Sequence, residues 1–196
     1  MIVLDSVRHP RLLEMLNAGR VGVIPTDTIY GLTTLASNEE GVSRLYGLKK
    51  RYKKLGTFIA ADIQQLISLG LDEQALRAVV HLWPNPISIV IPTLKSGGYL
   101  DLGKGSLAVR IPKDEGLLEL LKQTGPLVTS SANLFDQPPA NTIPEAQAYF
   151  GDKVDFYVDA GERTDNPPST IALFSDGKLE ILRQGSIKLD EKGNII

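Results

Sequence analysis

The sequence contains no cysteine and only two histidines, His9 and His81, which lie far apart along the chain. The lack of cysteine excludes disulfide bonds, a zinc site built on thiolates and a cysteine nucleophile. Two distant histidines do not suit a metal site built on imidazoles. Any chemistry must therefore come from hydroxyl, carboxylate, amide and cationic side chains.

Long hydrophobic runs are also lacking, since no stretch approaches the roughly 20 apolar residues that cross a membrane. The first residues, MIVLDSVRHPRLLEM, carry their basic side chains after the short apolar run, unlike a secretory signal. The motifs GxGxxG, HExxH and GxSxG do not occur. We expect a cytoplasmic protein without a membrane partner.

One segment, Gly98-Tyr-Leu-Asp-Leu-Gly103-Lys104, matches most of the P-loop pattern. A P-loop requires Ser or Thr directly after the lysine and a helix behind it. Here Gly105 follows the lysine, and the next residues, Leu107 to Ile111, form a strand-like apolar run. The segment is therefore not interpreted as a P-loop.

The composition that is present is typical of a globular domain, with 196 residues, 42% hydrophobic and 22% charged, and we expect one domain over residues 1–196. The net charge is −2, but six of the 21 cations fall within eleven positions without an acid. Such a run suits either a local polyanion or a solvated helix end, and both interpretations stay open. The six are Arg44, Lys49, Lys50, Arg51, Lys53 and Lys54.

Helical and strand-like segments alternate along the first part of the chain, and the end is rich in strands. Helices are predicted from Pro10 to Gly19, after a cap at Ser37 or Asn38, over 63–82 with a break near Gly70, over 115–122, and from Thr142 to 149. Strands are predicted over 21–24, 57–60, 87–91, 107–111, 127–129, 156–158, 170–174 and 179–182. This order favours an α/β fold with a mixed sheet and helices packed on it.

Hydroxyl side chains recur at the predicted strand ends, and two arginines lie in or at the end of apolar strands. An arginine among apolar neighbours must form an ion pair or face a cleft, because burying it alone is costly. Together these residues suggest a polar anion site, although each alone also suits a turn, a cap or a structural ion pair. They are Thr26, Thr28, Thr129, Ser130, Ser131, Ser169, Arg110 and Arg183.

Seven motifs follow one another in the order found in the YrdC-like family. They are Ile24-Pro-Thr-Asp-Thr-Ile-Tyr-Gly-Leu32, Lys49-x-Arg51, Trp83-Pro-Asn-Pro86, Leu107-Ala-Val-Arg-Ile-Pro112, Ser130-Ser-Ala-Asn133, Ser169-Thr-Ile171 and Ile181-Leu-Arg-Gln-Gly185. The chain thus resembles the threonylcarbamoyl-AMP synthases of this family from about Leu12 to Ile187. The resemblance implies an open, twisted mixed sheet with flanking helices and a concave basic cavity.

The resemblance also implies two sets of binding residues. Arg110 suits a carboxylate, which its guanidinium can bind through two N–H groups. The implied set for threonine is Thr26, Tyr30, Arg110, Thr129 and Ser169. The implied set for ATP is Lys49, Arg51, Ser106, Ser131, Asn133, Pro139 and Arg183, and neither a covalent or acid–base residue nor a metal ligand is assigned.

The implied reaction joins L-threonine, bicarbonate and ATP to give threonylcarbamoyl-AMP and pyrophosphate for tRNA modification. Mg²⁺ is expected to arrive with ATP. Direct contact with tRNA and the identity of the transferase complex that takes the product are left open. Two other interpretations remain: a non-catalytic RNA-binding module, and a YciO-type relative of unknown activity.

Five places depart from the family pattern. Tyr52 and Leu55 replace a proline and a polar residue near the implied nucleotide site, and Ala60 stands where some members have histidine. Asn85 replaces a glycine, and Leu134-Phe-Asp136 replaces small residues. None of them removes a charged group that the implied reaction needs.

Overall fold

The computed structural model describes residues 2–49, 55–95, 97–164 and 167–196. Within these residues ten strands form one sheet, in the order β1-β8-β2-β3-β7-β4-β6-β5-β9-β10. The strands are β1 (Ile2–Leu4), β2 (Gly22–Pro25), β3 (Tyr30–Leu35), β4 (Thr57–Ile59), β5 (Ile87–Pro92), β6 (Ser106–Arg110), β7 (Leu127–Ser131), β8 (Phe156–Val158), β9 (Thr170–Ser175) and β10 (Lys178–Arg183).

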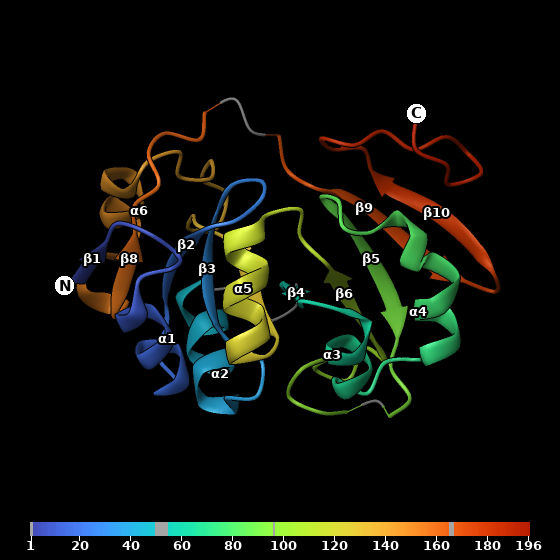
Figure 1. Ribbon diagram of the computed structural model, residues 1–196, viewed down its shortest axis with the longest axis horizontal. Coiled ribbons are helices and arrows are strands. Elements are labelled where there is room, and N and C mark those ends of the chain that lie inside the picture. The colour runs from blue at the N-terminus through green and yellow to red at the C-terminus, as the bar shows by residue number, and fades with distance from the viewer. Residues whose placement is uncertain (1, 50–54, 96, 165–166) are drawn as a thin grey trace.

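Six α-helices and two short 3-10 helices accompany the sheet in the described part of the chain. They are α1 (Pro10–Asn17), α2 (Glu39–Leu48), α3 (Ile63–Ser68), α4 (Glu73–Val79), η1 (Val80–Leu82), α5 (Glu115–Thr124), α6 (Ile143–Phe150) and η2 (Gly151–Lys153). Helix α5 lies over the middle of the sheet, between β1, β8, β2 and β3 on one side and β5, β9 and β10 on the other (Figure 1). The predicted α/β fold with an open mixed sheet is confirmed.

Local sequence explains why the predicted helices begin and end where they do. Asn38 accepts a hydrogen bond from the Gly41 amide and caps α2, and Thr142 caps α6 in the same way. The expected break in the 63–82 segment is also present: α3 ends before Gly70, whose φ of 80° favours glycine. Each of these signals lies within a few residues of the helix end that it marks, so it can be recognised without knowledge of the fold.

Two strands were not predicted. Strand β1 pairs in parallel with β8, which lies about 150 positions later along the chain, so no local pattern announces it. Strand β3 is buried along its whole length but carries hydroxyls, two of which donate to backbone carbonyls: Thr33 to Val128 and Thr34 to Arg20. Because β3 is buried on both faces, its sequence lacks the alternation of apolar and polar residues that predicts a strand. The two threonines also make the segment less apolar than other buried strands.

Two apolar layers flank the sheet. The smaller packs α1 and α5 against one face through residues such as Leu12, Leu117, Ile59 and Leu127. The larger packs α2, α3, α4 and α6 against the other face. The smaller layer does not cover the whole of its face of the sheet. The uncovered part of this first face carries polar side chains.

The P-loop-like segment is followed by strand β6 and not by a helix, as expected. The buried carboxylate of Asp101 accepts hydrogen bonds from the amides of Gly97, Gly103 and Gly105. Burial alone would raise the pKa of Asp101, but these amides and the Thr93 hydroxyl lower it below its usual value. The backbone N–H groups thus bind a carboxylate of the protein itself.

Candidate active site

A cavity of about 280 Å³ opens on the polar part of the first face. It is lined by residues from the β2–β3 turn, the start of β4, the ends of β6, β7 and β10, and the segment before β9. Eight predicted site residues line it, namely all five of the threonine set and three of the ATP set: Thr26, Tyr30, Arg110, Thr129, Ser169, Ser131, Pro139 and Arg183.

Strand register brings these residues to one face. Thr57 lies opposite Thr129 on β7 and opposite Ala108 on β6, so the three side chains share a face of the sheet. Arg110 lies two positions after Ala108 and therefore points to that face too. Gly31 also lines the cavity, and a Cβ at this position would lie 3.3 Å from Thr26 Cγ2.

The threonine hydroxyls of the cavity already donate to the protein. Thr26 Oγ1 donates to the Ile29 carbonyl at 2.7 Å, and Thr129 Oγ1 donates to the Thr57 carbonyl at 3.0 Å. A hydroxyl that has used its proton in this way offers only lone pairs to a ligand. Thr26 Oγ1 also accepts from the Thr28 amide at 3.2 Å and from Thr28 Oγ1 at 3.0 Å, so its lone pairs are already used. Thr129 therefore suits a ligand donor such as an ammonium or hydroxyl group, and it does not suit a carboxylate.

Arg110 supplies the complementary charge. Its side chain is 4% exposed, and Nη2 lies 2.9 Å from Asp27 Oδ1. Burial lowers the pKa of Arg110, Asp27 opposes that effect, and Arg183 adds to it. A guanidinium remains charged despite such shifts, so the cavity contains a buried cation beside its hydroxyls.

Arg183 approaches the cavity from β10. Its Nη2 donates to the Ser169 carbonyl at 2.7 Å, while the residue as a whole is exposed. The pairing of β10 with β9 shifts register between Ile181 and Arg183, and such an irregularity turns a side chain away from the regular alternation. The cavity therefore has one enclosed and one accessible arginine.

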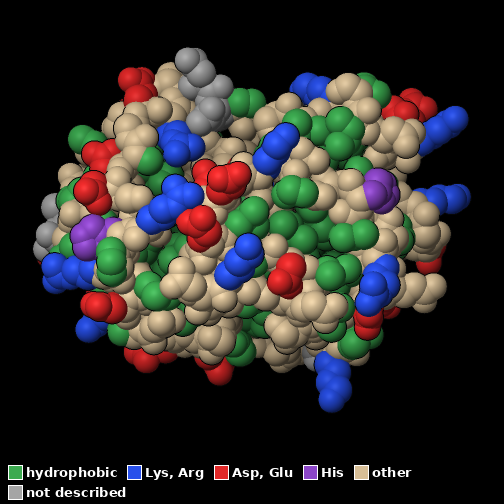
Figure 2. Space-filling view, viewed as in Figure 1, with side chains coloured by type: hydrophobic (Ala, Val, Ile, Leu, Met, Phe, Trp, Pro, Cys, Tyr) green, Lys and Arg blue, Asp and Glu red, His purple; other side chains and the backbone are tan. Residues whose placement is uncertain are grey.

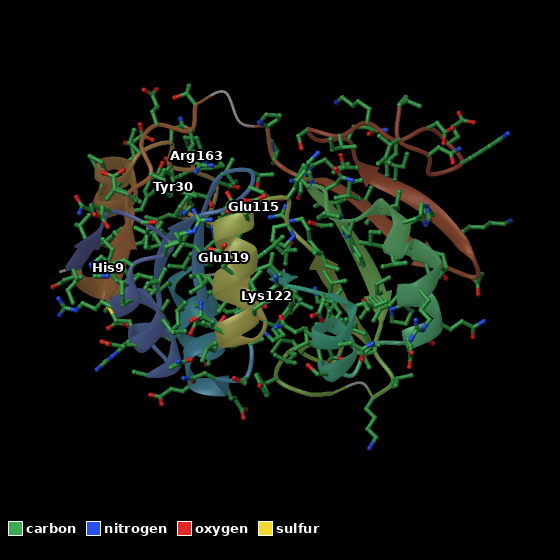
Figure 3. The ribbon with its side chains drawn as sticks, in the orientation of Figure 1. His9, Tyr30, Glu115, Glu119, Lys122 and Arg163 are labelled. Carbon is green, nitrogen blue, oxygen red and sulfur yellow. The ribbon has the colours of Figure 1, made fainter. Side chains whose placement is uncertain are left out.

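Tyr30 is among the residues that line the cavity, but it offers no free hydroxyl there. Its Oη donates to the Gly161 carbonyl at 2.8 Å and accepts from the Ala160 amide at 2.9 Å, and burial raises the pKa of Tyr30. Arg163, near Tyr30 in Figure 3, donates from Nη1 to the Thr26 carbonyl at 3.0 Å. Tyr30 and Arg163 thus fasten the segment after β8 to the β2–β3 turn.

Beside the cavity, Lys49 connects the end of α2 to the loop after β7. Its Nζ donates to the Ser131 carbonyl at 2.5 Å, to the Asn133 carbonyl at 2.6 Å and to Asn133 Oδ1 at 2.5 Å. Lys49 is 1% exposed, and Asn133 Oδ1 also accepts from Ser131 Oγ. Lys49 and Asn133 therefore lie next to the cavity residue Ser131 without themselves lining the cavity.

The remaining two predicted residues stand apart. Ser106 is half-buried at the start of β6, on the same face as Arg110 but at the other end of the strand, and it does not line the cavity. Arg51 lies outside the described residues, as does Tyr52 among the departures from the family pattern. Leu55, another departure, lines the cavity.

Sequence reasoning missed two charged residues near the site. The motif that contains Asp27 does not indicate its contact with Arg110, and no motif contains Arg163. Each lies in a polar loop, where Asp and Arg are ordinary surface residues. Only their contacts with Arg110 and with the Thr26 carbonyl distinguish them, and no local signal predicts such contacts.

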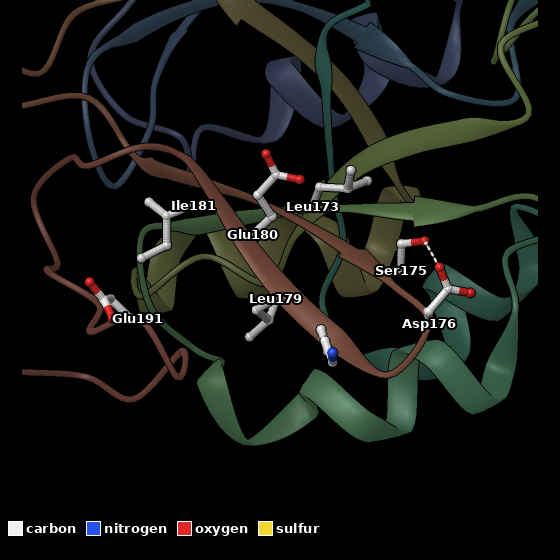
Figure 4. A pocket seen from close by; sticks show the side chains of 8 residues that line it. Leu173, Ser175, Asp176, Leu179, Glu180, Ile181 and Glu191 are labelled. Atoms are coloured by element: carbon white, nitrogen blue, oxygen red, sulfur yellow. Dashed lines mark hydrogen bonds between the residues drawn. The ribbon is translucent and has the colours of Figure 1, made fainter.

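A larger hollow of about 700 Å³ lies along the β9–β10 hairpin (Figure 4). It contains no predicted site residue, and it includes the acids Asp176, Glu180 and Glu191 beside one cation, Lys178. Ser175 donates to Asp176 at 3.1 Å. This excess of acids does not suit an anionic nucleotide, so the smaller cavity is the better candidate site.

Among the described side chains, no group of three or more His, Cys, Asp or Glu residues could hold a metal ion. In the same part of the chain, the helices are all too short or too polar to cross a membrane. On the face shown in Figure 2, basic and acidic side chains are interspersed over the surface.

Comparison with known proteins identifies the family. A model of the Sua5/YciO/YrdC family, described as telomere recombination, matches residues 14–185. The chain therefore belongs to this family. One curated relative, the threonylcarbamoyl-AMP synthase of Idiomarina loihiensis, is 35% identical over 152 residues, which cover 73% of this chain and 82% of the relative.

Solved structures share the fold. P. abyssi Sua5, solved in complex with L-threonine, matches with a TM-score of 0.83 and 24% identity, over 96% of this chain and 59% of that one. The chain thus spans about 59% of that larger structure. E. coli YciO matches with a TM-score of 0.77 and 18% identity, over 94% of both chains. The family resemblance expected from the motifs is confirmed.

Proposed function

We propose that this chain is a threonylcarbamoyl-AMP synthase, a nucleotidyltransferase that makes threonylcarbamoyl-AMP from L-threonine, bicarbonate and ATP. The observation that carries the proposal is the cavity itself. It combines two arginines with hydroxyl side chains, of which Thr129 can only accept from a ligand, and its described lining residues include no carboxylate. The curated relative with the same activity in its name supports the proposal.

Threonine is assigned to the buried end of the cavity. Arg110 binds the α-carboxylate, because a guanidinium can donate two parallel hydrogen bonds to it. The lone pairs of Thr129 accept from the amine or from the side-chain hydroxyl, and Thr26 lines the pocket beside it. Ser169, whose Oγ lies 3.1 Å from Ser88 Oγ, lines the same pocket, and so does Tyr30.

ATP is assigned to the side of the cavity formed by Ser131, Pro139 and Arg183. Arg183 is accessible and offers positive charge to the phosphates. Asn133 and Lys49 contact Ser131 and support it. On the family pattern, Ser106 and Arg51 bind the nucleotide as well. Mg²⁺ accompanies ATP as part of the substrate, and the triphosphate holds it.

The chemistry needs no covalent enzyme intermediate. The amine of threonine and bicarbonate form a carbamate with loss of water. A carbamate oxygen then attacks the α-phosphorus of ATP, an oxygen–phosphorus bond forms, and the bond from that phosphorus to the bridging oxygen of pyrophosphate breaks. Positioning of reactants can supply about 7–11 kcal/mol, and the arginines stabilise the charge that develops at phosphorus.

The product then passes to a transferase that modifies tRNA, and we assign the enzyme to the cytoplasm. Whether tRNA touches this chain directly is a separate question. On the face in Figure 2 the described basic side chains do not gather into one broad patch, so that face does not favour the RNA-binding alternative.

The test is pyrophosphate release from ATP, measured with and without L-threonine and bicarbonate, with the nucleotide product identified by mass. We expect release that requires both. Arg110→Lys should lower kcat/KM for threonine about 100-fold, because lysine cannot donate two parallel hydrogen bonds to the carboxylate. Arg11→Lys, at an exposed position on α1, should have no effect. Release that ignores threonine, together with tight and steeply salt-dependent RNA binding, would favour the RNA-binding module.

A further inference from the structure

Asp27 lies in the turn between β2 and β3, directly behind the cavity arginine. Its side chain is 2% exposed, and Oδ1 lies 2.9 Å from Arg110 Nη2. Its other oxygen, Oδ2, accepts from the Lys113 amide at 3.1 Å. Asp27 therefore connects the β2–β3 turn both to the last residue of β6 and to the segment that follows β6.

This ion pair is incomplete. Although the two charged groups are close, neither Asp27 Oδ1 nor Arg110 Nε has a hydrogen-bond partner among the described residues. Buried polar atoms in folded proteins nearly always have partners, so each exception requires an explanation. Arg110 lines the cavity, whereas Asp27 is not among the lining residues, so a ligand in the cavity can reach the arginine but not the aspartate.

We propose that Asp27 is a positioning residue that holds the Arg110 guanidinium so that its unpartnered Nε–H is available to the carboxylate of the amino-acid substrate. The inference rests on the proposed function, in which Arg110 binds that carboxylate. Asp27 neutralises the buried cation when the cavity is empty, and its charge holds the guanidinium close through Nη2. The Lys113 amide in turn fixes the Asp27 carboxylate.

Asp27→Asn keeps the size of the side chain and removes its charge. Small misplacements of a binding group have large effects, so we expect the Kd for L-threonine to rise by about 10- to 100-fold. L-Threoninol has the amine and hydroxyl of threonine but no carboxylate, so its Kd should change less than about threefold. Asp5→Asn, at an exposed position, is the matched control and should change neither value.

Two further variants separate positioning from general support of the fold. If Asp27 acts through Arg110, Asp27→Asn should add almost nothing to the loss already caused by Arg110→Lys. Asp27→Glu retains the charge but displaces it, so it should weaken threonine binding selectively even if Asp27→Asn proves too unstable to purify. In both Asp27 variants the KM for ATP should stay within about twofold of the wild-type value.

Calorimetric titration of the full chain with threonine and threoninol measures these values without turnover. Equal weakening of both ligands, or additive losses in the double variant, would show that Asp27 only supports the turn and would overturn the proposal. A wild-type protein that binds both ligands equally would overturn it too, because Arg110 then does not read the carboxylate. Failure of the proposed function is a different result: threonine binds selectively, but no pyrophosphate is released.

Discussion

The substitution Lys49→Met tests whether the buried ammonium of this lysine holds the loop after β7. Methionine has a similar length and fills the same space, so the change removes the charge and its hydrogen bonds while leaving the packing largely intact. Three oxygens lie within 2.6 Å of Nζ, and they belong to Ser131 and Asn133. The loss therefore falls on one loop.

The size of the effect follows from what each oxygen retains. The Ser131 carbonyl keeps a hydrogen bond from the Asn133 amide, and Asn133 Oδ1 keeps one from the Ser131 hydroxyl. The main loss is the charge-assisted bond to the Asn133 carbonyl, which is worth about 1.5–3 kcal/mol. With the two weakened contacts, we expect the free energy of unfolding to fall by about 2–4 kcal/mol.

For a chain of this size such a loss lowers the melting temperature by roughly 5–15 °C, which thermal unfolding without ligand can measure. The exposed Lys122 on α5 provides the control, since Lys122→Met should change stability by less than about 0.5 kcal/mol. The KM for ATP should rise as well, because Ser131 lines the nucleotide side of the cavity. An unchanged melting temperature with a raised KM for ATP would refute this reasoning and make Lys49 a direct phosphate ligand.

Three other predictions concern selectivity, backbone packing and pH. L-Valine should be a poor substrate in the pyrophosphate assay, because it lacks the hydroxyl proton that Thr129 can accept, and equal turnover would mean that the pocket reads shape alone. Gly185→Ala should lower the melting temperature and raise the KM for threonine, because a Cβ would lie 2.2 Å from the Pro168 carbonyl oxygen beside Ser169; an unchanged KM would argue against placing threonine near Ser169. Burial alone would raise the pKa of Asp155, but hydrogen bonds from Arg44 and the Val21 amide hold it below its usual value. Its contribution to stability is therefore present above the unfolded pKa of about 3.9 and lost as pH falls through the folded value. The difference in melting temperature between wild type and Asp155→Asn should accordingly stay constant above about pH 5 and shrink in acid, and a difference that persists in acid would exclude this charge effect.

The sequence predicted the helices and most strands because their signals are local. The caps at Asn38 and Thr142 and the break at Gly70 depend on neighbouring residues alone. Strand β1 and the order of the strands depend on pairing between distant segments. Strand β3 was not predicted because its threonine hydroxyls make the segment look polar. The same division applies to the site: residue types at strand ends could be identified, but their contacts could not.

The predicted ATP residues illustrate this limit. Lys49 belongs to a basic run that suits either a polyanion or a helix end, and the sequence leaves both interpretations open. In the structure its ammonium contacts protein oxygens next to Ser131, a relationship set by how α2 packs on the sheet. Ser106 shares a face with Arg110 but lies at the other end of β6. Strand β6 extends beyond the cavity, so Ser106 does not line it.

Local placement, more than net charge, determines what the cavity can bind. The whole chain carries a charge of −2, which by itself argues against an anionic substrate. Interactions between exposed charges are largely screened beyond about 8–10 Å, so acids elsewhere on the surface have little effect on a ligand in the cavity. Close to Arg110 the opposing charge is Asp27, and it lies behind the guanidinium. A carboxylate entering from the cavity therefore meets the cation first, and the aspartate limits the cost of burying that cation when no substrate is present.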